Sequence, residues 1–236
     1  MKAAFVPSTL ILRPLGRDSK NVPLQAMHQY FIKTPWWVRK LFSSYLWRMP
    51  ADGKTVYLTF DDGPHSTITP WVLSELKRYN AVATFFCVGK NVVQFPEVYQ
   101  QIIAAGHAVG NHTYHHLNGW KTANNIYLKD VEKASTVIDA HLFRPPYGRI
   151  RFGQAKSLKY VMKKNNVKVV MWDVLSADFD ASVSPETCAA NVLANVESGS
   201  IVVFHDSEKA FRNLKHTLPL VLEKLLKEGY SFKKLE

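Results

Sequence analysis

The first residues able to do chemistry are two adjacent aspartates, Asp61 and Asp62, which follow the β-branched and aromatic run Val56–Phe60. Side chains alternate in direction along a strand, so neighbouring carboxylates at its end are expected to point in different directions. One of them can then bind a metal ion while the other stays free as a base. Gly63 and Pro64 turn the chain sharply after the pair. The competing interpretation is an ordinary acidic turn before a helix.

A second group, three histidines within five residues, follows the short run Ala108–Gly110. His112 and His116 are four residues apart, so one helical turn would place them on the same face, while His115 would face away from His112. Neutral imidazoles at this spacing suit zinc or a similar divalent ion. Three protein ligands with an open position are typical of a catalytic metal site. We expect Asp62, His112 and His116 to supply them; the alternative is a polar loop.

Arg144 stands before two prolines, Pro145 and Pro146, in the sequence Arg-Pro-Pro-Tyr-Gly. The prolines stiffen the backbone and thereby fix the direction in which the arginine points. A guanidinium group can hold a carboxylate through two hydrogen bonds, and Asp61 is the obvious partner. The competing interpretation is a proline-rich turn that carries a surface arginine.

His205 follows the run Ser200–Phe204. A carboxylate beside it would orient the imidazole and raise its pKa, and Asp178 is the candidate. A histidine tuned in this way can donate a proton near neutral pH. A lone histidine after a strand is often structural, but His205 would lie at the same edge as the expected metal ligands.

The elements that must position these residues form a regular pattern from Lys54 onward. Short β-branched or aromatic runs alternate with longer amphipathic stretches, which indicates a parallel sheet covered by helices. In a closed barrel or a doubly wound sheet, catalytic side chains gather at the carboxyl ends of the strands. The expected strands are 56–60, 83–88, 108–110, 142–143, 167–172, 200–205 and 231–234. The expected helices are 69–79, 95–105, 126–139, 154–164, 186–197 and 214–228.

We divide the chain into an N-terminal region, residues 1–53, and a catalytic domain, residues 54–236. Residues 1–26 show no clear period, and Met27 is an alternative start of translation. Phe31–Met49 is rich in aromatic and basic residues, a composition that suits a membrane interface and equally suits a helix that caps the domain. We favour the cap and keep peripheral membrane contact through residues 31–49 as the alternative.

The composition, 47% hydrophobic and 21% charged residues, is that of an ordinary globular protein. The net charge of +11 would attract polyanions. No ribonucleoprotein motif or zinc-finger spacing accompanies this charge, so nucleic-acid binding is not expected. No protein partner is expected either.

Cys87 and Cys188 lie in apolar surroundings and are expected to be buried, reduced thiols. No stretch approaches about 18 consecutive apolar residues. No small-residue cleavage site follows the N-terminal apolar run, so a signal peptide is not expected. The sequence therefore favours a cytoplasmic protein or one peripheral to a membrane.

Together, these motifs resemble those of the polysaccharide deacetylases of carbohydrate esterase family 4, the NodB-homology domain, over residues 54–235. Thr59–Pro64 looks like the first motif of that family and His112–His116 like the second. Arg144–Gly148 looks like the third and Val203–His205 like the fifth. Four motifs in the right order are a specific signal, and the resemblance implies a distorted (β/α)7 barrel.

The fourth motif departs from the family pattern. Leu175 stands where an acidic residue is frequent, and Phe179 stands where tryptophan is usual. Asp178 is retained. The change is expected to alter the apolar wall of the site, and thus substrate preference more than activity.

By this resemblance, Asp61 is the general base, Arg144 orients it, His205 is the general acid and Asp178 supports His205. A bound Zn²⁺ would lower the pKa of water toward about 7, and Asp61 would take a proton from that water. The backbone N–H of Tyr147 would hold the oxyanion, and His205 would protonate the leaving amine.

The resemblance also assigns Asp62, His112 and His116 as ligands of a divalent ion, with Zn²⁺ as the first candidate and Co²⁺ or another divalent ion as the next. Further side chains around the site are expected to contact the substrate. They are Pro146, Tyr147, Trp172, Leu175, Phe179 and Phe204.

The expected function is metal-dependent hydrolysis of the acetamide of an N-acetylglucosamine-containing polysaccharide, with release of acetate. Two alternatives keep the same fold: an O-acetyl ester hydrolase acting on a carbohydrate, and an inactive glycan-binding module. A third, an electrostatic nucleic-acid binder, would show affinity that falls steeply with salt and does not depend on metal.

Overall fold

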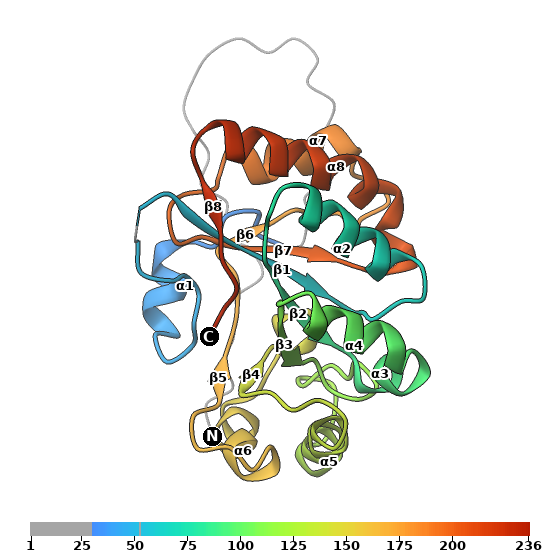
Figure 1. Cartoon of the computed structure of the whole chain (residues 1–236). Coiled ribbons are helices and arrows are strands. Elements are labelled where there is room, and N and C mark those ends of the chain that lie inside the picture. Colours follow the sequence, from blue (N-terminus) through green and yellow to red (C-terminus); the bar gives the residue numbers. More distant parts are fainter. Residues whose placement is uncertain (1–29, 52) are drawn as a thin grey trace.

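A parallel β-sheet forms the centre of the computed structural model, which describes residues 30–51 and 53–236 (Figure 1). The strands lie in the order β5-β4-β3-β2-β1-β7-β6, and β8 pairs with the beginning of β1. The expectations for residues 1–26 and for Met27 concern residues outside the described part. The strands are β1 (Thr55–Asp61), β2 (Thr84–Cys87), β3 (Ala108–Asn111), β4 (Leu142–Phe143), β5 (Lys168–Val169), β6 (Val174–Leu175), β7 (Ile201–His205) and β8 (Ser231–Phe232).

Helices cover one side of the sheet because alternate strand residues are apolar on that side. Phe60 of β1 and Phe204 of β7 pack with residues of α2 and α8, whereas Tyr57 and Ile201 lie in a separate apolar cluster. Asp61 lies on the same face of β1 as Tyr57, because side chains alternate along a strand, and it therefore faces away from the helices. The helices are α1 (Trp36–Leu41), α2 (Ile68–Arg78), α3 (Gly89–Gln94), α4 (Pro96–Ala104), α5 (Asn124–Ser135), α6 (Phe152–Val161), α7 (Pro185–Leu193) and α8 (Glu208–Lys227).

The segment before β1 lies between the two edge strands of the sheet, β5 and β6, and pairs with residues at both edges. Lys33 forms an antiparallel bridge with Val174 of β6, and Leu46 forms a parallel bridge with Val170, next to β5. α1 lies between these two bridges. The polar edges of the terminal strands are thereby paired instead of being left open.

All seven expected strands are present, and β6 is an additional strand of two residues that the sequence pattern did not reveal. The six expected helices are present too, while α3, whose sequence Gly-Lys-Asn-Val-Val-Gln is poor in helix formers, was missed. α8 begins at Glu208, earlier than expected. Its first turn is largely polar and exposed, so the amphipathic pattern did not reveal it. Cys87 and Cys188 are buried free thiols, as predicted. Within residues 30–51 and 53–236, no helix combines the length and apolar character needed to cross a membrane.

Candidate metal centre and active site

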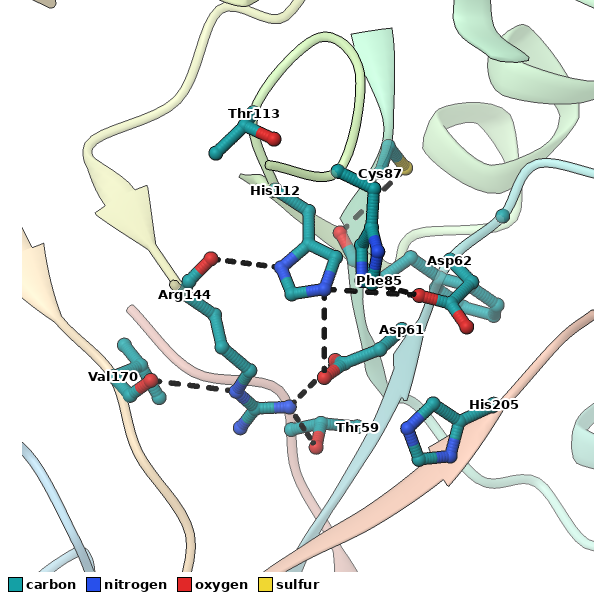
Figure 2. Close-up of polar contacts among 12 residues, drawn as sticks. Thr59, Asp61, Asp62, Phe85, Cys87, His112, Thr113, Arg144, Val170 and His205 are labelled. Carbon is teal, nitrogen blue, oxygen red and sulfur yellow. Dashed lines mark hydrogen bonds and ion pairs between the residues drawn. The ribbon is translucent and has the colours of Figure 1, made fainter. Parts of the chain in front are cut away.

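Asp61 is the last residue of β1 and Asp62 follows it at the carboxyl edge of the sheet, and both carboxylates approach the same histidine (Figure 2). The Nε2 atom of His112 lies 4.0 Å from an Asp61 oxygen and 3.8 Å from Oδ1 of Asp62. Apart from this shared neighbour the two carboxylates have different partners, since Asp61 accepts from Arg144 and Asp62 lies 3.1 Å from the His116 Nε2. Asp62 has a φ of 80°, so it leaves the extended conformation for which side-chain alternation holds.

The histidine segment is a loop and not the predicted helical turn. Thr113 and His116 have φ values of 64° and 57°, and these left-handed residues fold the chain back on itself. The His112 and His116 rings still come together, with centroids 5.0 Å apart. His115 points away and contacts Asp130, whose Oδ1 lies 2.5 Å from the His115 Nδ1. The proximity of His112 and His116 was therefore predicted correctly, but a loop brings them together and not a helical turn.

Asp62, His112 and His116 form a set of atoms suited to a divalent cation. One ligand atom from each lies within 4.8 Å of the others. The Oδ1 atom of Asp62 is buried and has no hydrogen-bond donor in the described part of the chain, while the His116 Nε2 lies 3.1 Å from it. A buried carboxylate oxygen without a donor, facing two imidazoles, is the arrangement that a cation would satisfy.

The protonation states of this set also suit a cation. Burial lowers the pKa of His112 to about 4, against the opposing effect of Asp61, so its imidazole is neutral. The His112 Nδ1 lies 2.7 Å from the Arg144 carbonyl oxygen, which can only accept, so the Nε2 carries the free lone pair. Burial alone would raise the pKa of Asp62, but contact with His116 and the proximity of His205 hold it well below its usual range.

Arg144 is fully buried and fixes the Asp61 carboxylate. Its Nη1 donates hydrogen bonds of 2.7 Å to Asp61 Oδ1 and to the Thr59 hydroxyl (Figure 2). Its other nitrogens donate to the carbonyl oxygens of Val170 and Met171. Since the guanidinium is held from several sides, one Asp61 oxygen is tied to Arg144 and the other faces His112.

His205 ends β7 directly beside Asp61 in the strand register. Its Nδ1 lies 2.8 Å from Asp178 Oδ1, and its backbone N–H donates to Asp178 Oδ2 at 2.9 Å. Burial would lower the pKa of His205, but Asp178 outweighs this effect and raises it to about 9. The imidazole is therefore protonated at neutral pH. The Phe179 ring lies against it, with centroids 5.1 Å apart.

Tyr147 and Trp172 lie at the surface near these groups. The Tyr147 side chain is 61% exposed, and its ring centroid is 4.7 Å from that of His116. Trp172 is partly exposed and lies next to Gly148, where a Cβ would collide with its ring. Pro146 is buried under this turn.

The structure does not bring Phe204 to the site. Phe204 is fully buried and stacks on Phe60 on the helix-covered side of the sheet, with ring centroids 5.9 Å apart. It directly precedes His205 in a strand, so its side chain points the opposite way. Leu175 is buried in β6, where it pairs with Val203.

Asp206 is a further residue of this edge that the sequence reasoning missed. It is buried, accepts a hydrogen bond from the Gly63 N–H at 3.0 Å, and accepts another from the Thr69 hydroxyl at 2.5 Å. A Cβ at residue 63 would collide with the Asp206 carboxylate, so this contact requires glycine. Burial raises the pKa of Asp206 to about 8, despite the opposing hydrogen bond from Thr69. Its position after His205 was the available signal.

A cleft of about 340 Å³ opens beside the metal-ligand set. It is lined by Asp62, Val88, Lys90, Asn91, His115, His116 and Ser207. The cleft gives the set a route to solvent. A ligand can therefore reach Asp62 and His116 from solvent.

Comparison with known proteins agrees with this geometry. Residues 48–170 match the profile of the family described as Polysaccharide deacetylase. A peptidoglycan-N-acetylglucosamine deacetylase of Bacillus cereus is 36% identical over 177 residues, which are 72% of this chain and 62% of that protein. A chitooligosaccharide deacetylase of Azorhizobium caulinodans is 32% identical over 167 residues, 67% of this chain and 77% of that protein.

A crystal structure of a peptidoglycan N-acetylglucosamine deacetylase, in complex with an N-oxidanyl-benzamide, superposes with a TM-score of 0.71 at 33% identity. The match covers 86% of this chain and 95% of that one. This similarity confirms the predicted distorted (β/α)7 barrel. The chain spans 62% of the Bacillus cereus relative named first, so that protein has sequence without a counterpart in the match.

Proposed function

The chain belongs to the polysaccharide deacetylase family, and from this premise we propose that it removes acetyl groups from N-acetylglucosamine units of a polysaccharide. One observation carries the proposal. A fixed carboxylate, a three-residue cation site and a protonated histidine converge at one edge of the sheet. The relatives are deacetylases of peptidoglycan and of chitooligosaccharides, two substrates that share N-acetylglucosamine.

Asp62, His112 and His116 would hold a divalent cation, which when bound lowers the pKa of water and polarises an amide carbonyl. Two nitrogen ligands and one carboxylate oxygen are a donor set that suits Zn²⁺, which we propose as the ion, with Co²⁺ as a second candidate. The neutral state of His112 supports this assignment, since only the neutral ring can donate a lone pair.

Asp61 is proposed as the general base. Arg144 holds one of its oxygens at 2.7 Å, which fixes the orientation of the carboxylate and leaves the other oxygen available to accept a proton from the attacking water. The oxygen of this water forms a bond to the acetamide carbonyl carbon. When the C–N bond then breaks, the acetyl group leaves as acetate and the sugar keeps an amine. The N–H of Tyr147 is proposed to stabilise the oxyanion.

His205 is proposed to protonate the leaving nitrogen. Its pKa of about 9 means that it carries this proton at neutral pH. An amine is a poor leaving group and needs such an acid, whereas an ester leaving group needs it less. The Asp178–His205 pair therefore favours amide over ester hydrolysis.

The test is acetate release from N-acetylglucosamine oligomers and from peptidoglycan. The protein is stripped of metal with a chelator and then supplied with zinc, with cobalt or with buffer alone. We expect acetate only with a divalent ion. Acetate release that is the same without metal would contradict the proposed cation site, and no release from any glycan would contradict the deacetylase function.

A second measurement separates amide from ester cleavage. His205→Ala is expected to lose most amide hydrolysis while it retains more of its activity on an acetyl ester. Equal losses on both substrates would argue against a specific role of His205 as the acid for the amine.

A further inference from the structure

The helix α1 has two faces of opposite character. Val38 is buried, and Arg39 turns inward to contact Asp173, with its Nη1 3.5 Å from a carboxylate oxygen. Trp36 and Leu41 are 67% and 68% exposed. The capping prediction therefore describes only the inner face of this helix.

The exposed residues of α1 lie on one side of it. At about 100° per residue, Trp36, Trp37, Lys40 and Leu41 fall within an arc of about 140°. We call these four residues the α1 face. Trp37 is 44% exposed, and Lys40 is also exposed. Single exposed apolar residues are common, but three large ones on two turns of a helix form a patch that indicates an interaction surface.

The α1 face is held rigidly against the barrel. The fully buried carboxylate of Asp173 lies 2.9 Å from the Lys33 ammonium and 3.6 Å from the Arg48 guanidinium, in addition to its contact with Arg39. Backbone hydrogen bonds from Thr34 to Asp173 and from Leu46 to Val169, both 2.8 Å, fix the chain on either side of the helix. The exposure of the tryptophans is thus built into the fold.

The charge around this face is positive. Residues 30–51 contain four basic residues and no acidic one, in a chain of net charge +11. Three of the four, Lys33, Arg39 and Arg48, pair with Asp173 or Glu197, and Lys40 has no acidic partner within the described residues. Beside Trp36 lies a hollow of about 450 Å³, lined by two arginines, Arg39 and Arg48, together with Tyr45 and Trp47. A hollow with aromatic walls and guanidinium groups has the chemistry to receive an anionic headgroup next to inserted tryptophans.

The α1 face is at the opposite end of the strands from the catalytic edge. Asp173, which anchors α1, accepts a hydrogen bond from Ser200, the residue before β7, whereas His205 ends that strand. Five residues at about 3.3 Å each separate the two ends by roughly 16 Å. In Figure 1 the arrowheads of β1 and β7 point away from α1.

We propose that the α1 face docks on an anionic lipid bilayer, with Trp36, Trp37 and Leu41 at the depth of the headgroups and the basic residues against lipid phosphates. This arrangement combines interfacial tryptophans with positive charge, the two features that bind proteins to such surfaces. Bound in this way, the protein turns its catalytic edge away from the bilayer toward a polymer outside it. The docking does not depend on the catalytic reaction.

A second exposed aromatic surface, on α6, serves as the comparison. Phe152 and Tyr160 are 65% and 70% exposed, but the ammonium groups of Lys156 and Lys159 lie over their rings at 4.4 and 4.9 Å. Within the described residues, no such cation covers Trp36 or Trp37. The α6 rings are engaged within the protein, so the α1 face is the better candidate for insertion.

The experiment is co-sedimentation of the full chain with vesicles of phosphatidylcholine, with and without about one third phosphatidylglycerol. We expect binding to the anionic vesicles, weakened by salt because the charge attraction is screened. The double variant W36A/W37A is expected to bind at least about tenfold more weakly, and Lys40→Glu to bind several-fold more weakly. The matched control F152A/Y160A removes two aromatics that are about as exposed as Trp36 and more exposed than Trp37, and it is expected to bind within about twofold of wild type.

Unchanged melting temperatures and acetate release in these variants would show that folding and catalysis are intact, so a loss of vesicle binding reports on docking alone. The proposal would be overturned if the wild-type protein did not bind anionic vesicles, or if F152A/Y160A lost more vesicle binding than W36A/W37A. It would equally be overturned if W36A/W37A abolished self-association or binding to insoluble glycan while vesicle binding stayed the same.

Discussion

Replacing Asp178 by asparagine is expected to lower the pKa of His205 by more than about two units. Burial opposes the charged imidazole, and Asp178 is the main group that overcomes it, raising the pKa from 6.5 to about 9. Asparagine keeps the shape but loses the charge. It also has one acceptor oxygen where the carboxylate uses two, for the His205 ring and the His205 backbone N–H.

The same shift contributes to stability. The folded pKa of His205 lies above its unfolded value, so the contribution is fully present below about pH 6.5 and is lost as the pH rises through about 9. A difference of about 2.5 units corresponds to at most about 3.4 kcal/mol. Asp178→Asn should therefore flatten the fall in unfolding free energy between these pH values.

The assay is an NMR titration of the His205 imidazole in metal-free protein, which separates this effect from metal binding and from turnover. The matched control is Asp130→Asn, which removes a carboxylate from His115 instead. His205 should titrate near its usual pKa or lower in Asp178→Asn and should be unchanged in the control. A His205 pKa that stays near 9 in Asp178→Asn would refute the reasoning.

Three further perturbations follow from the site. Arg144→Met should cost about 3–5 kcal/mol in urea unfolding, because it leaves the Asp61 carboxylate buried and unpaired; a cost below about 1 kcal/mol would contradict this. Asp206→Ala removes the acceptor of the Gly63 N–H and should lower kcat with little change in KM. Asp206→Asn, whose oxygen can still accept, should recover part of the rate, and no recovery would argue against this positioning role. His116→Ala should weaken zinc binding, measured by chelator competition, at least about 100-fold, and unchanged affinity would remove it from the ligand set.

Residue types at strand ends were enough to predict which side chains meet. The alternation of strands and helices places Asp61 and His205 at one edge, and they lie side by side in the register of β1 and β7. The local conformations were not predictable in the same way. Asp62 and His116 adopt positive φ values that neither aspartate nor histidine requires, and the surrounding fold imposes them.

The error at Phe204 was avoidable. Side chains alternate in a strand, so a residue adjacent to an inward-facing His205 must face outward. Asp206 was harder to identify because its position after His205 does not by itself reveal that the carboxylate binds the Gly63 N–H. The two-residue strand β6 is too short for any periodicity to appear, and it is defined only by its pairing with β7.

The most direct test of the account compares acetate release by the wild type and by Asp61→Asn, with the zinc content of both proteins measured in the same samples. Asp61 is outside the proposed ligand set and is held by Arg144, so the variant should bind zinc as the wild type does. The account predicts equal zinc and no acetate from the variant. Full acetate release by zinc-loaded Asp61→Asn would contradict the proposed general base, and with it the mechanism built on this carboxylate.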